Sequence, residues 1–326
     1  MQLWSADDVR QALSPQVLVP AMTDVLSDLA RGRAVQPLRW VLDLAPPALL
    51  GLMPAWLPER RVVGAKLLTV FPDNPGAGRP GHQGVVVLFD DQTGSPLAIV
   101  DAEAVTALRT AAVSAVATEC LARPDACTLA LLGTGTQAET HLVGLMDVRP
   151  FTRVRVWSRN REHAAAFQRR MAGRVRVVPE PAASPADAVA GADVVCTLTG
   201  SPTPILDAAD VDAGTHINAV GACRPRHREL GTALVARGRL YVDHREAAAR
   251  EAGDYLIPLA EGAIADSHIV AELGQVLVGE RPGRQAPADV TIFKALGLAV
   301  EDVAAAAVLY GQRAFKASPR SEPAGG

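Results

Sequence analysis

The feature that most constrains the fold of this chain is a glycine-rich turn between an apolar run and a helix-forming segment. The apolar run spans Thr128 to Leu132, and the turn reads Gly133-Thr134-Gly135-Thr136-Gln137-Ala138, a G-x-G-x-x-A pattern. The first glycine permits a tight turn, the second lets the backbone approach a pyrophosphate, and the alanine lets the helix pack closely on the strand. Free N–H groups at the helix N-terminus then bind the phosphates. A plain tight turn is the alternative, but the strand–turn–helix context predicts a dinucleotide-binding site.

Further short apolar runs follow this turn, separated by helical or Gly/Pro-rich segments. They are Val154 to Trp157, Arg174 to Val178, Asp193 to Leu198, His216 to Val220 and Leu240 to Asp243. Continuous apolar strands that alternate with helices are typical of a parallel sheet buried on both faces. We therefore predict an α/β fold built on a Rossmann-type, doubly wound parallel sheet.

The part of the chain before residue 124 has a different pattern. Ser14 and Pro15 are typical of the start of a helix, which Gly32 would end. From residue 41 to residue 100, short apolar runs alternate with turn residues, and the segment 90–94 predicts a hairpin. Asp101 would then cap an Ala-rich helix that runs to about residue 121. This pattern predicts a second domain of the α+β class.

We predict the following domain boundaries. Residues 1–123 form the α+β domain, which a helix in the segment 294–317 completes. Residues 124–293 form the nucleotide-binding domain. The segment 318–326, rich in Ser, Pro and Gly, is expected to be disordered.

The composition excludes several classes of protein. The 326 residues include 32 Lys and Arg and 35 Asp and Glu, a net charge of −3, so we expect neither a nucleic-acid nor a membrane partner. No uninterrupted apolar run reaches the roughly 18 residues of a membrane-spanning helix. The four cysteines have no metal-ligand spacing, which predicts no metal site and a reducing cytoplasm.

The end of the second predicted strand indicates which dinucleotide binds. An NAD site usually carries an acidic residue there for the ribose hydroxyls, but this chain has Ser158, Arg159, Asn160 and Arg161. Guanidinium groups bind phosphate well, so we predict NADP(H) in preference to NAD(H). Two solvated surface arginines are the alternative. Residues at the ends of the fourth and fifth strands should also contact the cofactor, namely Thr197 and Val220.

Several polar side chains in the first domain lie within apolar sequence and are candidates for substrate binding. They are Arg39, Lys66, His82 and Arg109. An ionised group in apolar surroundings is costly unless it is paired, and no carboxylate flanks Lys66 or Arg109 at helical or cross-strand spacing. The cations can therefore meet at an anionic ligand such as a carboxylate, or each can be a snorkelling side chain or a structural ion pair. His82 can be a proton donor or a structural imidazole. Cys223, after the fifth strand, can line the site or pack as a small apolar residue.

A set of motifs then occurs in an order shared with a known family. The motifs are Lys66-Leu67, Leu88-Phe89-Asp90 through Thr93-Gly94-Ser95-Pro96-Leu97, Leu108-Arg109-Thr110-Ala111-Ala112, the turn at 133–138, His216-Ile217-Asn218-Ala219-Val220-Gly221, and Phe293-Lys294-Ala295-Leu296-Gly297 through Ala299-Val300-Glu301-Asp302. From about residue 36 to residue 310 the chain resembles the ornithine cyclodeaminase/mu-crystallin family. The resemblance implies a homodimer that forms through the sheet of the substrate domain. It also implies active-site roles for Arg39, Lys66, Gln83 and Arg109.

Departures from the cyclodeaminase pattern narrow the implied activity. Cyclodeaminases of this family carry a catalytic acid where this chain has Cys223, and a second carboxylate where it has Gly51. Cyclisation with release of ammonia needs a base, so we expect no cyclodeaminase activity. The segments around Met53, His82 and Cys223 look more like the mu-crystallin branch, which is similar to NADPH-dependent ketimine reductases.

The resemblance therefore implies an oxidoreductase that reduces cyclic ketimine carboxylates, with Met53 and Cys223 in the substrate pocket. Arg109 with Arg39 would bind the carboxylate, and Lys66 would lie near the imine. The proton could come from water, His82 or Lys66. Alternatives are an ornithine-type cyclodeaminase, an alanine-type dehydrogenase, a condensing amino-acid dehydrogenase, and a non-catalytic protein that binds NADPH and a small ligand.

Overall fold

The computed structural model describes residues 1–45 and 47–317, which form two compact units. The first unit comprises residues 1–14, 33–106 and 299–317, and the second comprises residues 15–32 and 107–298. The tail predicted at 318–326 lies outside the described residues.

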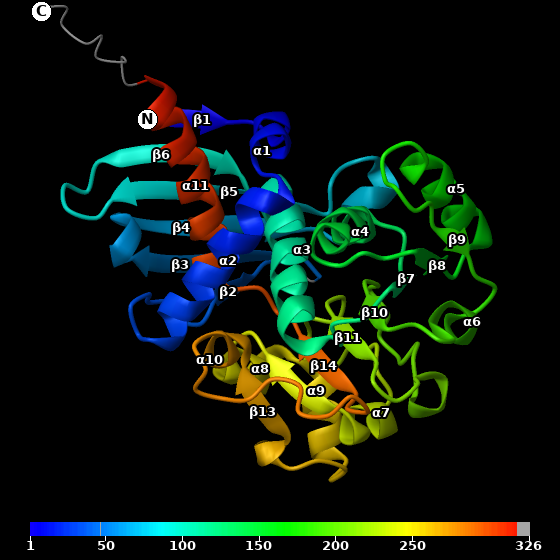
Figure 1. Cartoon of the computed structure of the whole chain (residues 1–326). Helices are drawn as coiled ribbons and strands as arrows, with labels where there is room; N and C mark the ends of the chain where they lie inside the picture. Colours follow the sequence, from blue (N-terminus) through cyan, green and yellow to red (C-terminus); the bar gives the residue numbers. More distant parts are fainter. Residues whose placement is uncertain (46, 318–326) are drawn as a thin grey trace, which may run out of the picture. The chain divides into compact units, whose positions relative to one another are not determined.

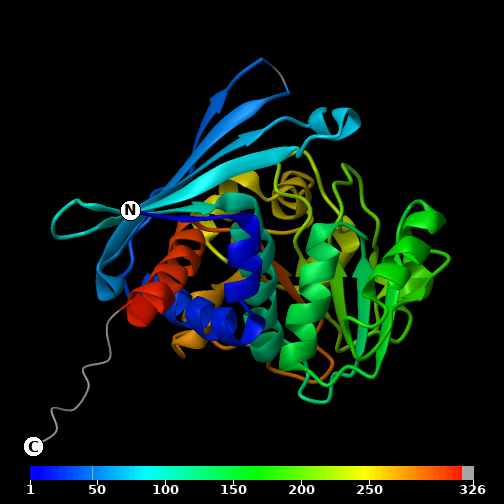
Figure 2. The ribbon, with the colours of Figure 1, turned by 90° about the horizontal axis from the view of Figure 1, so that it is seen from above.

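A six-stranded mixed sheet organises the first unit, in the order β1-β6-β5-β4-β3-β2. Its strands are β1 (Gln2–Trp4), β2 (Trp40–Asp43), β3 (Leu49–Leu57), β4 (Val62–Val70), β5 (His82–Asp90) and β6 (Pro96–Asp101). All neighbours are antiparallel except β1 and β6, and β5 and β6 form the predicted hairpin. The helix α11 (Ala299–Ala317) packs along β3, β4, β5 and β6 on one face (Figures 1 and 2), and α1 (Ala6–Ala12) packs on β6 and β1.

An eight-stranded, fully parallel sheet organises the second unit, in the order β13-β12-β14-β11-β10-β7-β8-β9. Its strands are β7 (Thr128–Leu132), β8 (Arg153–Trp157), β9 (Glu180–Pro181), β10 (Val194–Thr197), β11 (His216–Ala219), β12 (Arg239–Val242), β13 (Ile269–Glu272) and β14 (Thr291–Lys294). The helices are α2 (Pro15–Ala30), α3 (Ala102–Leu121, whose first turn belongs to the first unit), α4 (Thr136–Val148), α5 (Arg161–Met171), α6 (Pro185–Val189), α7 (Thr232–Arg237), α8 (Arg245–Glu251), α9 (Gly253–Ala260) and α10 (Leu273–Leu277). The strand order reverses between β7 and β10, and this is the predicted doubly wound arrangement.

Three parts of this sheet differ from the sequence prediction. Residues 174–178 form turns rather than a strand, and the third strand is only the short β9. The arginines that alternate with the valines explain this, because the Arg176 Nη2 donates to the carbonyls of Met146 and Arg149 at 2.8 and 2.9 Å. The strands β13 and β14 were not predicted, because each has only four residues and ends in a charged residue, Glu272 and Lys294.

The helices α2 and α3 also differ from prediction, because most of both belongs to the second unit. α2 packs on α10 and α4, and the Gln16 Nε2 donates to the Asp147 Oδ1 at 2.6 Å. α3 has the length and composition of a membrane-spanning helix, which the search for uninterrupted apolar runs missed, but 78% of its most apolar window is buried. Within the second unit, the Ser114 Oγ lies 2.9 Å from the His141 Nε2, and the Asn218 Nδ2 donates to the Thr118 Oγ1 at 3.0 Å. These buried bonds are typical of a helix in the core of a fold.

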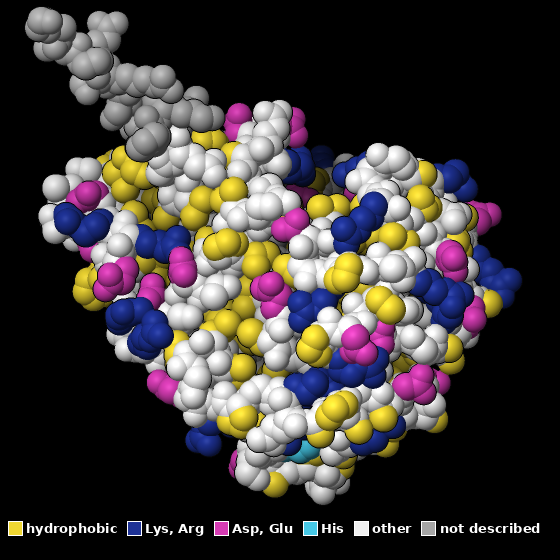
Figure 3. All heavy atoms as spheres, in the orientation of Figure 1, with side chains coloured by type: hydrophobic (Ala, Val, Ile, Leu, Met, Phe, Trp, Pro, Cys, Tyr) yellow, Lys and Arg dark blue, Asp and Glu magenta, His cyan; other side chains and the backbone are white. Residues whose placement is uncertain are grey.

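Charged side chains are mixed by sign on the face shown in Figure 3, where Lys and Arg alternate with Asp and Glu. This mixing agrees with the small net charge of −3 for the whole chain.

Two fully buried histidines should make the fold sensitive to acid. Burial lowers the pKa of His141 to about 4, and the hydrogen bond to the Gln137 carbonyl opposes this shift. Burial, and next the charge of Arg284, lower the pKa of His216 to about 3. Below the ordinary pKa of 6.5 the unfolded chain binds these protons and the folded chain does not, so the free energy of unfolding falls as the pH drops towards those folded values. At pH 5 each buried histidine should therefore lower the free energy of unfolding by about 2 kcal/mol.

Urea unfolding between pH 7 and pH 5 tests this expectation. His141→Gln and His216→Gln should each lose less stability over that interval than the unmodified protein. His163→Gln, on the exposed face of α5, is the matched control and should change nothing. Parallel pH profiles for all four proteins would contradict the prediction.

Candidate active site

The predicted glycine-rich turn joins β7 to α4 at the carboxyl edge of the parallel sheet. Gly133 has a φ of +136°, and a Cβ at this position would lie 2.8 Å from the Leu198 carbonyl oxygen, so a larger residue cannot fit without distortion. Gly135 is the N-cap of α4 and offers no side-chain cap to the first turn. A Cβ on Gly135 would project into open space. The helix N-terminus is therefore uncapped and open, as a pyrophosphate requires.

Two buried polar atoms near this edge support a ligand there. The Gln137 Oε1 and the Thr197 Oγ1 are buried and find no hydrogen-bond partner within residues 1–45 and 47–317. Gln137 lies in the first turn of α4, and Thr197 ends β10, the strand next to β7. A buried polar atom without a partner is costly unless a ligand or water satisfies it. The turn and these two atoms fit a bound dinucleotide, and Thr134 and Thr136 complete the segment that would hold it.

Two arginines, Arg170 in the last turn of α5 and Arg174 just after that helix, stabilise the glycine-rich turn and the start of α4, which the sequence analysis did not anticipate. The Arg170 Nη2 donates to the Thr134 carbonyl at 3.0 Å, and its Nε donates to the Glu139 Oε1 at 2.8 Å. The Arg174 Nη1 pairs with the other oxygen of Glu139 at 3.3 Å. These partly exposed pairs contribute little stability individually, but together they connect α5 to the turn and to the first turn of α4.

The predicted phosphate-binding loop follows β8, the neighbour of β7, so it lies at the same edge of the sheet. Ser158 is half-buried, whereas Arg159, Asn160 and Arg161 are exposed. The Asn160 side chain is already used as the N-cap of α5, where it accepts the Glu162 N–H at 2.9 Å. The two arginines remain as cations at the position where a ribose phosphate would lie in this fold.

The ends of β10 and β11 lie on the other side of the switch point. The Val220 N–H donates to the Thr197 carbonyl at 3.0 Å, which ties the two ends together. Cys223 follows Val220 and is exposed, and its Sγ lies 3.4 Å from the Val220 carbonyl and 3.7 Å from the Ala295 carbonyl. Cys223 therefore lies exposed beside the ends of β11 and β14, where its side chain could line a site.

In the first unit, Lys66 forms a buried ion pair that the sequence analysis did not predict. The Lys66 Nζ lies 2.6 Å from the Asp302 Oδ2, with side chains 4% and 0% exposed, and it also donates to the Thr106 Oγ1 at 3.3 Å. The search for a nearby carboxylate failed because Asp302 comes from α11, far away in the sequence. Met53 is the cross-strand partner of Lys66 and is buried beside it. The ion pair is one of the three interpretations of Lys66, and the role of this residue towards an anionic ligand stays a prediction.

The other predicted residues of the first unit lie at strand ends. Arg39 is half-buried and directly precedes Trp40, whose partner is Leu52, so Arg39 lies level with Met53. His82 and Gln83 begin β5 and are exposed. By strand alternation His82 shares the sheet face of Lys66 and Gln83 lies on the opposite face, because Val86 is the partner of Lys66. The structure therefore groups Arg39, Met53 and Lys66 more closely than Gln83.

Arg109 belongs to the second unit, on α3, and is only 4% exposed. Its guanidinium packs against the loop that follows β14, because a Cβ on Gly297 would lie 2.6 Å from both terminal nitrogens. Gly297 has a φ of +82°, which also favours glycine. The Asp243 Oδ2 accepts the N–H groups of Leu296 and Gly297 at 2.5 and 2.7 Å. The loop is thus shaped to leave room for Arg109.

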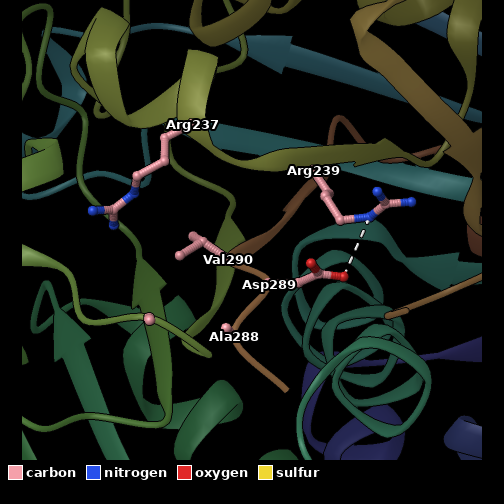
Figure 4. Close-up of a pocket in the computed structure, with 6 residues that line it drawn as sticks. Arg237, Arg239, Ala288, Asp289 and Val290 are labelled. Carbon is pink, nitrogen blue, oxygen red and sulfur yellow. Dashed lines mark ion pairs between the residues drawn. The ribbon is translucent and has the colours of Figure 1, made fainter. Parts of the chain in front are cut away.

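A small cavity of about 210 Å³ lies elsewhere in the second unit. Figure 4 shows that Arg237 and Arg239 flank it, with Asp289 paired to Arg239 at 3.6 Å. Arg239 begins β12 and Val290 precedes β14, so the cavity lies at the amino edge of the sheet, opposite the glycine-rich turn. It is therefore separate from the dinucleotide site.

The doubly wound sheet, the open turn and the unsatisfied buried atoms define a pyridine-nucleotide-dependent oxidoreductase. The chain belongs to the ornithine cyclodeaminase/mu-crystallin family, whose model matches residues 2–316. This confirms the family resemblance on which the predicted active-site roles depend.

Three similar proteins illustrate the range of the family. The ketimine reductase mu-crystallin of Mus musculus is 41% identical over 311 residues, which cover 94% of this chain and 95% of that protein. The structure of the Δ1-pyrroline-2-carboxylate reductase of Thermococcus litoralis, in complex with NADH and L-proline, has a TM-score of 0.94 and 31% identity, covering 97% of this chain and 98% of that one. An archaeal alanine dehydrogenase dimer with bound NAD has a TM-score of 0.92 and 30% identity, covering 98% and 97% of the two chains.

Proposed function

We propose that this protein reduces cyclic ketimine carboxylates, such as Δ1-pyrroline-2-carboxylate or Δ1-piperideine-2-carboxylate, to cyclic amino acids, with NADPH as the reductant. The observation that carries the proposal is similarity over nearly the full chain to two reductases, one of which is named for a cyclic imine and holds L-proline. The exposed thiol of Cys223, where a cyclodeaminase would need an acid or base, also supports reduction rather than deamination.

We assign the following roles in the reaction to residues of this chain. The cofactor, held by the turn at 133–138 and by Thr197 and Val220, supplies a hydride when bound. Arg109 binds the substrate carboxylate, since a guanidinium fork matches a carboxylate and Gly297 leaves it room. Orientation of the imine carbon towards the hydride donor then provides most of the rate enhancement.

Lys66 would hold positive charge and a proton close to the imine nitrogen. The Asp302 carboxylate at 2.6 Å stabilises the ammonium form in this buried position. Arg39, level with Met53, adds a second cation for the substrate carboxylate. His82 and a water molecule are the other possible proton donors for the imine.

The proposal is tested by following NADPH and NADH oxidation with the purified protein and the five- and six-membered cyclic imine carboxylates. L-ornithine, L-proline and pyruvate with ammonia are run beside them. We expect NADPH oxidation with a cyclic imine and little with the other compounds. Ornithine turnover without imine reduction would establish a cyclodeaminase, and tight NADPH binding without any turnover would favour a condensing enzyme or a binding protein.

The preference for NADPH depends on Arg159 and Arg161, and it gives a direct prediction. Replacing both arginines by alanine should raise KM for NADPH by about 10- to 100-fold, because two charge-assisted bonds to the 2′-phosphate are lost. KM for NADH should change by less than about threefold, since NADH lacks that phosphate. Arg153→Ala, at the other end of β8, is the matched control. Equal effects on both nucleotides would contradict the assignment.

We further propose that the protein is a homodimer formed through the open face of the first sheet. Cross-strand register places five large apolar residues on the face opposite α11, and all are exposed. They are Leu3, Trp40, Leu42, Trp56 and Phe89. An apolar patch of this kind marks an interface. The dimeric alanine dehydrogenase of similar fold supports the proposal.

Sedimentation of Trp56→Glu tests the dimer. We expect the unmodified chain to sediment as a dimer and the variant as a monomer, because burying a new carboxylate in an apolar interface is unfavourable. Val178→Glu, at an exposed apolar position of the second unit, should leave the dimer intact. A dimer that survives Trp56→Glu would argue against this face.

The state of the cysteines supports a proposal about the cellular compartment in which the protein works. Cys120, Cys127, Cys196 and Cys223 form no disulfide bond within residues 1–45 and 47–317. Free thiols persist in a reducing compartment, which supports our proposal that the protein works in the cytoplasm.

A further inference from the structure

A buried carboxylate connects the two strand ends on the far side of the switch point. Glu229 lies between β11 and α7 and is fully buried. Its Oε1 accepts the N–H of Thr199 at 2.7 Å and the hydroxyl of Thr199 at 2.6 Å, and its Oε2 accepts the N–H of Gly221 at 2.9 Å. Thr199 follows β10 and Gly221 follows β11, so one side chain fixes both ends.

Two further buried charges hold Glu229 in place. The Asp254 Oδ1 accepts the N–H groups of Glu229 and Leu230 at 2.8 and 3.0 Å, and its Oδ2 pairs with the Lys294 Nζ at 3.1 Å. The Lys294 Nζ also donates to the Ala219 carbonyl at 3.1 Å. Glu229, Asp254 and Lys294, which we call the strand-end cluster, are all at most 2% exposed. Through them the ends of β10, β11 and β14 form one hydrogen-bonded network.

The strand-end cluster carries two carboxylates and one ammonium in a buried site. Burial raises the pKa of Glu229, and the hydrogen bonds from Thr199 and the charge of Lys294 oppose that rise. Apolar side chains would usually serve stability at least as well as buried charges, so three such groups at one edge of the sheet need another reason.

The position of the cluster supplies that reason. In a doubly wound sheet the dinucleotide lies across the switch point, with one half over each set of strands. The turn at 133–138 and the loop at 158–161 would hold the adenosine half. The nicotinamide half would then lie over the ends of β10 and β11, which Glu229 connects.

We propose that Glu229 is a positioning residue, which sets the spacing between the Thr199 and Gly221 backbones on which the nicotinamide ring rests. This inference depends on the pyridine-nucleotide site of the proposed function. The packing at Gly221 shows how tightly this spacing is set. A Cβ there would lie 2.0 Å from the Thr199 carbonyl oxygen and 2.6 Å from the Glu229 Oε2.

The experiment compares two ligands on three variants. NADPH contains the nicotinamide, whereas 2′-phospho-ADP-ribose retains everything except that ring. Glu229→Gln and Thr199→Val each remove hydrogen bonds of the Glu229 carboxylate. Thr215→Val is the matched control, because this buried threonine precedes β11 at the opposite edge and donates one bond, to the Ala192 carbonyl.

We expect Glu229→Gln to weaken NADPH binding by about tenfold or more in calorimetry, with Thr199→Val intermediate. Binding of 2′-phospho-ADP-ribose should change by less than about twofold, and bound NADPH should become more accessible to a fluorescence quencher. With a cyclic imine substrate, kcat should fall more than KM for the imine rises. Thr215→Val should lower the melting temperature as much as Thr199→Val without these effects.

The proposal would be contradicted if Glu229→Gln lost the same affinity for both ligands, or if Thr199→Val and Thr215→Val had the same effect on NADPH affinity. Either result would leave the strand-end cluster with a purely structural role. Should Glu229→Gln fail to fold, Thr199→Val decides the question. The binding assay needs no substrate, so it separates the two proposals. A selective loss of NADPH affinity in a protein that reduces no imine would keep the role of Glu229 and overturn only the substrate assignment.

Discussion

Arg109→Ala should lower kcat/KM for the cyclic imine by about 10³-fold, because it removes the buried, charge-assisted contact with the substrate carboxylate that we propose for Arg109. Arg109 is only 4% exposed, so water cannot easily replace its guanidinium. NADPH affinity, measured by calorimetry, should stay within about twofold, since the turn at 133–138 is unchanged. Arg109→Lys should be intermediate, because it keeps the charge but loses the planar fork.

The control for this variant is Arg149→Ala. Arg149 is half-buried in the same unit and donates to the carbonyls of Val148 and Glu119 at 2.9 and 3.1 Å, so its loss also removes a partly buried cation. We expect Arg149→Ala to cost stability and to leave kcat/KM nearly unchanged. A near-normal kcat/KM for Arg109→Ala would show that the carboxylate binds elsewhere.

The buried pair of Lys66 and Asp302 gives the largest expected effect on stability. Lys66→Met or Asp302→Leu alone should lower the free energy of unfolding by about 3–5 kcal/mol, because each leaves one buried charge without its partner. The double variant should lose much less, since it replaces both charges with apolar groups of similar size. Urea unfolding of the unmodified protein, the two single variants and the double variant gives the four free energies of a double-mutant cycle.

Activity of the double variant then separates two roles for Lys66. If Lys66 only packs the first unit, the double variant should regain both stability and imine reduction. We expect it to regain stability and to remain inactive, because our proposed function assigns to Lys66 the positive charge near the imine. Recovery of near-normal kcat/KM in the double variant would show that Lys66 has no role in the reaction.

The glycine-rich turn between β7 and α4 could be predicted from the sequence because its signals are local. The turn at 133–138, the apolar run before it and the helix after it lie within about 20 residues, and each follows from backbone sterics or strand and helix periodicity. The hairpin at 90–94 and the helix after Asp101 were predicted for the same reason. The Asp101 Oδ1 does accept the Ala104 N–H at 2.8 Å, as a helix cap should.

Weak or mixed local signals account for the structural errors. Residues 174–178 alternate valine with arginine as an exposed strand would, but the arginine side chains bond to neighbouring segments and hold a turn. The strand β14 is short and ends in Lys294, so its pattern does not stand out from a loop. Its central place between β11 and β12 depends on pairing with strands that are distant in sequence.

The class of the fold, the glycine-rich turn and the family could all be predicted from the amino-acid sequence, because they depend on short-range patterns that occur in order along the chain. The tertiary structure alone decided which buried charges meet. Asp302 reaches Lys66 from the last helix, and Asp254 and Lys294 enclose Glu229 from separate elements. The physical reason is that a buried charge needs a partner in space, and the chain can supply that partner from any distance along the sequence.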